Sequence, residues 1–201
     1  VGDRILIHSA AGGVGQAAVQ LAQRAEAKVF ATASSSKKSA LQEMGVLQVM
    51  NSRTLDFADE IMRLTDEKGV DLILNSLNGE YIPKNLEILS DNGRLIEIGK
   101  IGIWSQEQVK QERQDISYFP FDLLTIAQKE PNLIAALWSK LISAFEKGDL
   151  KPLPHTVFPI EESVKAFRYM ASAQHIGKVI LTFPKNSSFS PKNHLNDAYL
   201  I

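Results

Sequence analysis

Short apolar runs alternate with segments of helical periodicity along the first 100 residues of the chain. The apolar runs predict five buried strands, over residues 4–9, 28–32, 48–50, 71–75 and 94–98. Helices are expected between them, over residues 13–25, 36–43, 55–64 and 83–89. Strands and helices that alternate at this rhythm form βαβ units, so the pattern predicts an α/β fold with a doubly wound parallel sheet of Rossmann type.

The first predicted helix has the clearest periodicity. Its apolar positions fall on one face, which we expect to be buried: Val14, Ala17, Ala18, Leu21, Ala22 and Ala25.

The second half of the chain has a different pattern. Residues 100–120 are polar and rich in Gln and Glu, and predict an irregular segment. A long amphipathic helix should follow Pro131 and end at Gly148, and a proline-rich extended stretch leads to a helix over 161–171 and a strand over 178–183. The tail at 184–196 is rich in Ser, Asn, Lys and Pro, a composition typical of a linker. These changes divide the chain into parts 1–148, 149–183 and 184–201.

Composition narrows the classes of function. The 201 residues are 44% hydrophobic, and 22 basic side chains balance 23 acidic ones for a net charge of -1. This charge gives no electrostatic footprint for nucleic acid or an anionic membrane, and no segment has the roughly 18 apolar residues of a membrane span. With no cysteine, disulfides and thiolate metal sites are excluded, and we expect no metal site. The chain begins with Val1 rather than Met, which leads us to expect a piece of a longer protein.

A glycine-rich loop lies between the first strand and the first helix. In the sequence SAAGGVG at 9–15, Gly12 and Gly15 stand where a dinucleotide-binding turn needs close approach of the pyrophosphate and of the strand, although Ala10 replaces the first glycine of the strict motif. The free N–H groups of the helix start would attract the pyrophosphate. The alternative is a tight turn without a ligand. The residues expected at the cofactor are Ala11, Gly12, Gly13, Val14 and Gly15.

The end of the second strand indicates which dinucleotide is bound. NAD-binding proteins usually place a carboxylate there, whereas this chain reads TASSSKK at 32–38. A 2′-phosphate requires donors and positive charge. We therefore predict NADP(H), with Ser34 and Lys37 as phosphate contacts and Lys38 and Arg53 as further candidates. A solvated helix start with incidental lysines is the alternative.

The nicotinamide should lie at the carboxyl ends of the fourth and fifth strands. Small and polar residues there let the backbone approach the carboxamide, and the candidates are Asn75, Ser76, Leu77 and Gly99. Asn75 equally fits a capping or turn role. His8, within the first strand, is expected to be a packed, hydrogen-bonded residue.

Seven segments resemble the medium-chain dehydrogenase/reductase superfamily, and more narrowly the enoylreductase domains of modular polyketide synthases and animal-type fatty acid synthases. They are GDRILIHSAAGGVGQAAVQLA (2–22), FATASSSKK (30–38), NSRTLDF (51–57), GVDLILNSLNGE (69–80), GRLIEIGK (93–100), FDLL (121–124) and HIGKVILT (175–182).

The resemblance implies how the parts of the chain are organised. Residues 1–148 would form the NADP(H)-binding Rossmann domain, and 149–183 the return segment of a GroES-like substrate domain that precedes this region in the family and is absent from the chain. Residues 184–201 would be a linker that runs into the opening strand of a ketoreductase domain. The implied location is cytoplasmic, and a homodimer is conceivable because relatives pair through edge strands.

The resemblance also implies a reaction, the NADPH-dependent reduction of a 2-enoyl thioester on an acyl carrier protein. The family's candidate proton donors, a lysine after the fifth strand and an acid about 20 residues later, correspond to Lys100 and Asp122. The alternative roles are a solvent-facing loop lysine and a helix N-cap. The chain alone is expected to bind cofactor without turnover, and zinc is not expected in this branch. A free-standing quinone oxidoreductase and an inactive nucleotide-binding domain are the alternative functions.

Overall fold

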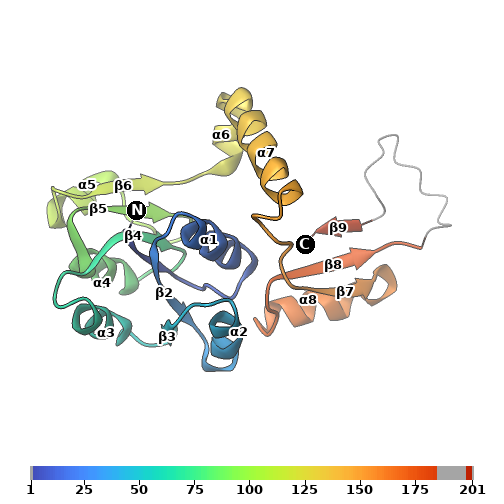
Figure 1. Cartoon of the computed structure of the whole chain (residues 1–201), viewed down its shortest axis with the longest axis horizontal. Helices are drawn as coiled ribbons and strands as arrows, with labels where there is room; N and C mark the ends of the chain where they lie inside the picture. Colours follow the sequence, from blue (N-terminus) through green and yellow to red (C-terminus); the bar gives the residue numbers. More distant parts are fainter. Residues whose placement is uncertain (1, 185–197, 201) are drawn as a thin grey trace.

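A computed structural model describes residues 2–184 and 198–200 of the chain (Figure 1). The main sheet contains six strands: β1 Arg4–Ile7, β2 Lys28–Ala33, β3 Gln48–Asn51, β4 Val70–Asn75, β5 Leu89–Glu97 and β6 Ser117–Pro120. The α-helices are α1 Gly13–Arg24, α2 Lys38–Glu43, α3 Phe57–Leu64, α4 Tyr81–Ile88, α5 Gln106–Glu112, α6 Leu123–Lys129, α7 Pro131–Glu146 and α8 Ser163–Ala171. Short 3₁₀ turns, η1 Ser35–Lys37 and η2 Ile160–Glu162, precede α2 and α8.

The six strands are all parallel and follow the order β3-β2-β1-β4-β5-β6. This is the doubly wound order predicted from the sequence. The order reverses between β1 and β4, so the chain leaves these two neighbouring strands toward opposite sides. A crevice opens at their carboxyl ends, which is where ligands bind in this class of sheet.

Both faces of the sheet are buried, because successive side chains of each strand point to opposite faces. Leu6 of β1 packs into a core with residues of α3, α4 and α5, while its neighbours Ile5 and Ile7 pack with residues of α1 and α2. The sheet therefore separates two helical layers, and each short apolar run in the sequence supplies both of them.

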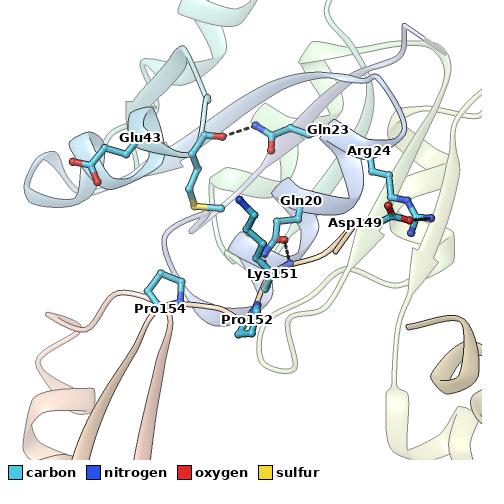
Figure 2. A pocket seen from close by; sticks show the side chains of 9 residues that line it. Gln20, Gln23, Arg24, Glu43, Asp149, Lys151, Pro152 and Pro154 are labelled. Carbon is cyan, nitrogen blue, oxygen red and sulfur yellow. Dashed lines mark hydrogen bonds and ion pairs between the residues drawn. The ribbon is translucent and has the colours of Figure 1, made fainter. Parts of the chain in front are cut away.

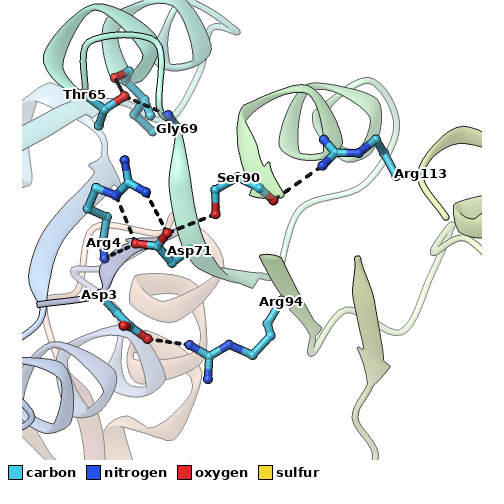
Figure 3. Close-up of polar contacts among 9 residues, drawn as sticks. Asp3, Arg4, Thr65, Gly69, Asp71, Ser90, Arg94 and Arg113 are labelled. Carbon is cyan, nitrogen blue, oxygen red and sulfur yellow. Dashed lines mark hydrogen bonds and ion pairs between the residues drawn. The ribbon is translucent and has the colours of Figure 1, made fainter. Parts of the chain in front are cut away.

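Polar contacts fix the amino ends of three central strands, at the edge of the sheet remote from the crevice (Figure 3). The Asp71 carboxylate of β4 accepts hydrogen bonds from the Arg4 backbone N–H at 2.8 Å and from its guanidinium at 3.0 and 2.7 Å, and from the Ser90 hydroxyl at 3.0 Å. The hydrogen bonds from Arg4 lower the pKa of Asp71 to about 2. Because β1, β4 and β5 each contribute a group, this cluster holds their register.

A second, smaller sheet follows α7. It pairs β7 His155–Pro159 in parallel with β8 Lys178–Thr182, and β8 in turn pairs antiparallel with β9 Ala198–Leu200. Helix α8 covers the sheet through a small core formed by Phe158, Ala166, Val179 and Leu181.

The segment that leads to the smaller sheet is attached to helix α1 of the main sheet (Figure 2). The Gln20 side-chain amide donates to the Lys151 carbonyl at 3.1 Å and accepts from the Lys151 N–H at 2.9 Å. Arg24 forms an ion pair with Asp149 at 2.9 Å. These groups line a pocket of about 570 Å³ beside the connecting segment.

The prediction of an irregular segment over 100–120 is wrong, because this stretch contains α5 and β6. Helix α5 begins with a capping box, in which the Gln108 N–H donates to the Ser105 hydroxyl and the Gln108 side chain accepts from the Ser105 N–H. Only Tyr118 of β6 is buried, so this edge strand has too few buried positions to show a clear pattern. The fifth strand also begins earlier than predicted, at Leu89.

The predicted buried face of α1 is rotated from the observed one. Val14 and Leu21 are 56% and 52% exposed, and the buried residues of the helix are Gly15, Gln16, Val19 and Ala22. The contact line passes through Gly15 because the missing side chain allows the helix to approach the sheet closely there. A prediction from the spacing of hydrophobic residues cannot identify a glycine as a contact position, because glycine has no hydrophobic side chain.

Part of the predicted linker, 185–197, and residue 201 of the predicted ketoreductase-like end lie outside the described residues. Within the part of the chain that the structure describes, no helix is long and apolar enough to cross a membrane.

Candidate functional site

The glycine-rich loop connects the carboxyl end of β1 to the start of α1. Its backbone turns sharply, with the Gly12 N–H donating to the Ser9 carbonyl at 3.0 Å, and Ser9 adopts a positive φ of 51°. The Gln16 side-chain amide donates to the Ala11 carbonyl at 2.9 Å. No side chain caps the first N–H groups of α1, because the N-cap residue is Gly12. A parallel β-bridge joins Gly12 to Gly177, and the uncapped N–H groups of Val14 and Gly15 are therefore available to an anion.

The three glycines of the loop have different surroundings. A Cβ atom at Gly15 would lie 2.5 Å from the Ala10 Cα and 2.7 Å from the Ser9 carbonyl oxygen, so this position requires glycine for helix–strand contact. A Cβ atom at Gly12 would lie 3.4 Å from its nearest neighbour, the same Ser9 oxygen. The protein thus leaves space at Gly12, the position where the sequence pattern predicts close approach of the pyrophosphate.

Gly13 is covered by a side chain from the second sheet. A Cβ atom there would lie 2.8 Å from the Lys178 Nζ atom. The ammonium group of Lys178 thus lies over the start of α1, where a pyrophosphate is expected. Lys178 is not among the residues predicted from the sequence, since it lies more than 160 residues away along the chain.

A pocket of about 290 Å³ lies beside the loop, at the carboxyl end of β2. The lining residues come from four parts of the chain: Ser9, Ala11, Gly12, Ala33, Ser34, Lys37, Ser52, Arg53, Ala173 and His175. Five predicted cofactor residues therefore lie together, namely Ala11, Gly12, Ser34, Lys37 and Arg53. None of the lining residues is acidic, and burial lowers the pKa of Lys37. An anion bound here would offset the cost of burying the Lys37 charge.

The carboxyl ends of β4 and β5 are tied together by buried side chains. The Asn75 amide donates to the Glu97 carboxylate at 2.5 Å and to the Leu77 carbonyl at 2.7 Å, and its oxygen accepts from the Leu77 N–H. The other Glu97 oxygen accepts from the Gly99 N–H at 2.6 Å. Both side chains are fully buried, and desolvation raises the pKa of Glu97. The Asn75 side chain is thus engaged within the protein, and it positions the backbone that carries Leu77.

Glu97 is a further residue of the site that the sequence patterns did not identify, because it lies inside an apolar run. A carboxylate in the interior of a buried strand signals a required hydrogen-bonding role, and the segment RLIEIGK contains this signal. Here Glu97 connects the two loops that contain the predicted nicotinamide contacts Ser76, Leu77 and Gly99. Ser76 lies toward the glycine-rich loop, since its hydroxyl is 3.4 Å from that of Ser9.

Lys100 and Asp122 lie next to each other although they are 22 positions apart. The Lys100 Nζ atom is 3.2 Å from an Asp122 carboxylate oxygen and donates to the Phe121 carbonyl at 3.2 Å. Asp122 also caps α6, where it accepts from the Leu124 N–H at 3.2 Å and the Thr125 hydroxyl at 2.8 Å. The pKa of Asp122 is lowered by the hydrogen bond from Thr125 and then by that from Lys100. Asp122 is thus both the partner of Lys100 and the N-cap of α6, and the Lys100 side chain is 61% exposed.

His8 is buried behind the loop, as expected. Its Nε2 atom donates to the Asn85 side-chain oxygen at 2.8 Å, and its Nδ1 atom lies 3.0 Å from the Thr32 hydroxyl. The ring makes an edge contact with Phe57 at 5.0 Å. Burial lowers the pKa of His8 to about 4, so the ring is neutral at neutral pH. His8 supports the carboxyl ends of β1 and β2 and does not line the pocket.

The arrangement of sheet, glycine loop and cationic pocket defines a dinucleotide-binding oxidoreductase domain, and comparison with known proteins assigns its family. Residues 44–181 match the model of a family described as zinc-binding dehydrogenase. The chain belongs to this family, within the medium-chain dehydrogenase/reductase superfamily, and is homologous to the enoyl reductase domains of polyketide synthases.

Two solved structures show this closer relationship. The nucleotide-binding subdomain of the enoylreductase domain of PpsC from Mycobacterium tuberculosis is 39% identical, with a TM-score of 0.68, and the match covers 75% of this chain and 86% of that one. The CurK enoyl reductase is 59% identical with a TM-score of 0.88, over 91% of this chain and 55% of that one.

The curated relatives are much longer than this chain. A mycocerosic acid synthase-like polyketide synthase of Mycolicibacterium smegmatis is 41% identical over 187 residues, which cover 91% of this chain and 9% of the synthase. The chain therefore spans about a tenth of such a synthase and about half of the CurK structure.

The family description names zinc. In residues 2–184 and 198–200, no three His, Cys, Asp or Glu side chains lie together in a way that could hold a metal ion. These residues do not fit a zinc site. The uncapped N–H groups of α1, the space at Gly12 and the cationic pocket fit a nicotinamide dinucleotide.

Proposed function

We propose that the chain is the cofactor-binding part of an NADPH-dependent enoyl reductase that reduces a 2-enoyl thioester on an acyl carrier protein in polyketide or fatty acid synthesis. The pocket at the end of β2 supports the choice of NADPH most directly. It combines the Ser34 hydroxyl with the charges of Lys37 and Arg53, and none of its lining residues is acidic. A 2′-phosphate gains from these groups, whereas the ribose 2′-hydroxyl of NADH lacks the carboxylate acceptor that it usually finds there.

In this proposal the loop and the pocket hold the two charged regions of the cofactor. The N–H groups at the start of α1 bind the pyrophosphate, with Lys178 above Gly13 as an additional cation. Ser34, Lys37 and Arg53 bind the 2′-phosphate. The backbone of Ser76, Leu77 and Gly99 positions the nicotinamide, which supplies a hydride when bound, and the buried Asn75–Glu97 pair fixes those loops.

Lys100 is the proposed proton donor of the reaction. Its ammonium group follows the carboxyl end of β5, where the reacting ring is expected, and would deliver a proton to the α-carbon or stabilise a developing enolate oxygen. Asp122 is ionised, since hydrogen bonds lower its pKa, and it orients the Lys100 ammonium through the 3.2 Å ion pair. The ion pair thus holds the Lys100 side chain in place between turnovers.

The organisation of the larger protein is part of the proposal. Residues 1–148 are the NADP(H)-binding domain, and 149–183 are the return segment of a substrate domain that the chain does not include. An acyl carrier protein would present the substrate, and a ketoreductase domain would follow 184–201. The CurK structure is longer than the part that matches this chain, which covers 55% of it, and this agrees with a further domain in the larger protein.

Fluorescence titration with NADPH and NADH tests the cofactor assignment. We expect NADPH to bind at least ten times more tightly than NADH, since one charge-assisted contact is worth about 1.5–3 kcal/mol. Replacing both Ser34 and Lys37 by Ala should weaken NADPH binding and leave NADH binding nearly unchanged. Replacing Ser139 and Lys140, which are exposed on α7 and do not line the pocket, by Ala is the matched control. Equal affinities of the wild-type chain for the two cofactors would refute the assignment.

A further inference from the structure

His175 lines the same pocket as the predicted phosphate ligands, although it lies in the loop before β8 of the smaller sheet. The loop that contains His175 joins α8 to β8, and two consecutive backbone N–H groups at its end form hydrogen bonds with other segments. The Gly177 N–H donates to the Ala11 carbonyl of the glycine-rich loop at 3.0 Å, and the Lys178 N–H donates to the Pro154 carbonyl at 2.9 Å. The backbone next to His175 is therefore held against the cofactor loop.

The backbone at Gly177 can take this path only because the residue is a glycine. It has a φ of 73°, and a Cβ atom there would lie 1.9 Å from the Pro154 carbonyl oxygen. Only glycine permits the chain to pass so close to Pro154 and still reach Ala11. On the other side, the His175 ring makes an edge contact with Tyr169 of α8 at 6.2 Å. The imidazole is thus supported by backbone and by an aromatic ring.

The hydrogen bonding of the His175 ring is incomplete within the described residues. Its Nδ1 atom is buried and has no hydrogen-bond partner among the residues that the structure describes. A buried polar atom without a partner costs about 1–3 kcal/mol. The His175 ring lines the pocket, so an anion bound there would lie next to an imidazole that can donate a hydrogen bond.

The charges around His175 are positive. Lys37 of η1 and Arg53 after β3 line the same pocket, and no carboxylate lines it. Desolvation and then the Lys37 charge lower the pKa of His175. Both effects favour the neutral imidazole when the pocket holds no anion. A dianion bound between His175 and Lys37 would offset the repulsion between the Lys37 charge and a protonated His175, and it would accept a hydrogen bond from the imidazole.

We propose that His175 is a specificity-determining ligand of the 2′-phosphate, and that it takes up a proton when the phosphate binds. This inference rests on the proposed binding of NADPH. It predicts that the preference for NADPH over NADH increases as the pH falls, because only the phosphate can pair with an imidazolium. It also means that the phosphate links the nucleotide-binding sheet to the segment that contains β7 and β8.

The test measures the dissociation constants of NADPH and NADH for the 201-residue chain at pH 6.5 and pH 8.5. For the wild-type chain we expect the NADPH preference to rise about five- to tenfold from pH 8.5 to pH 6.5, as for one histidine whose pKa crosses this range on binding. His175→Gln retains a hydrogen-bond donor without the titration, so its preference should lose this extra pH dependence. His155→Gln, at an exposed histidine outside the pocket, should behave as the wild type.

The outcomes separate this inference from the proposed function. If the wild-type chain binds NADPH and NADH equally at both pH values, the cofactor assignment fails. If NADPH is preferred but His175→Gln keeps the full pH dependence, the cofactor assignment stands and the role of His175 is refuted. Loss of the pH dependence in His175→Gln, with NADH affinity unchanged, supports the role.

Discussion

Replacing His8 should change how the stability of the chain depends on pH. The ring is 3% exposed and lies between Thr32 and Asn85, with Phe57 at its edge. No carboxylate hydrogen bonds to it, so burial dominates and lowers its pKa from 6.5 to about 4. The unfolded chain therefore binds a proton at a higher pH than the folded chain does.

The sign and size of the effect follow from proton linkage. The His8 contribution is constant above about pH 6.5 and is progressively lost as the pH falls toward 4. With pKa values of about 4 folded and 6.5 unfolded, the loss between pH 7.5 and pH 5.0 is about 2 kcal/mol. Glu97 acts in the opposite direction, because its raised pKa favours the folded state as the pH falls. A comparison of variants therefore isolates His8.

Urea denaturation at pH 7.5 and pH 5.0 measures this difference. We expect the free energy of unfolding of the wild-type chain to fall by about 2 kcal/mol more than that of His8→Gln between the two pH values. His155→Gln, at an exposed histidine, is the control and should follow the wild type. If His8→Gln lost as much stability as the wild type on acidification, the account of His8 as a buried neutral ring would be refuted.

Two further predictions concern the loop and the proposed proton donor. Gly15→Ala should destabilise the fold by about 1–3 kcal/mol, because its Cβ would meet the Ala10 backbone at 2.5 Å. Gly12→Ala should keep the thermal stability of the wild type and lose NADPH affinity by on the order of tenfold or more in a fluorescence titration. Unchanged affinity in Gly12→Ala would place the pyrophosphate elsewhere. In a longer protein that includes the substrate-binding half, Lys100→Ala should lower the kcat of enoyl reduction on the order of 100-fold with the NADPH dissociation constant retained, and Lys110→Ala, at an exposed lysine of α5, should not. Unchanged turnover in Lys100→Ala would remove Lys100 from the mechanism.

Most of the fold could be predicted from local pattern, because parallel strands buried on both faces read as short apolar runs. The errors have physical causes. The edge strand β6 buries one residue, so it lacks such a run, and α5 was identifiable from the Ser105–Gln108 capping box rather than from periodicity. In α1 the contact line runs through a glycine, which contributes no hydrophobicity to the pattern.

The candidate site could be predicted only where its residues share one loop or strand end. The residues of the 9–15 loop and Ser34 and Lys37 after β2 belong to local motifs, and the structure places Ala11, Gly12, Ser34, Lys37 and Arg53 around one pocket. His175 and Lys178 reach the same region from the segment of the second sheet, more than 120 residues later in the chain. Their positions depend on a tertiary contact, the hydrogen bond between Gly177 and Ala11, which no local pattern encodes.

That contact also explains how the cofactor loop can be ready for an anion before one binds. The Ala11 carbonyl accepts hydrogen bonds from both the Gln16 side chain at 2.9 Å and the Gly177 N–H at 3.0 Å, so this acceptor is satisfied within the protein. The first N–H groups of α1 have no intrahelical partner and no side-chain cap, because Gly12 precedes them. With its acceptor engaged and no side-chain cap on the Val14 and Gly15 N–H groups, the loop offers a donor surface whose shape is already fixed. Binding then costs little ordering of the loop, and the same hydrogen bond from Gly177 that prepares the pyrophosphate site holds His175 at the 2′-phosphate pocket.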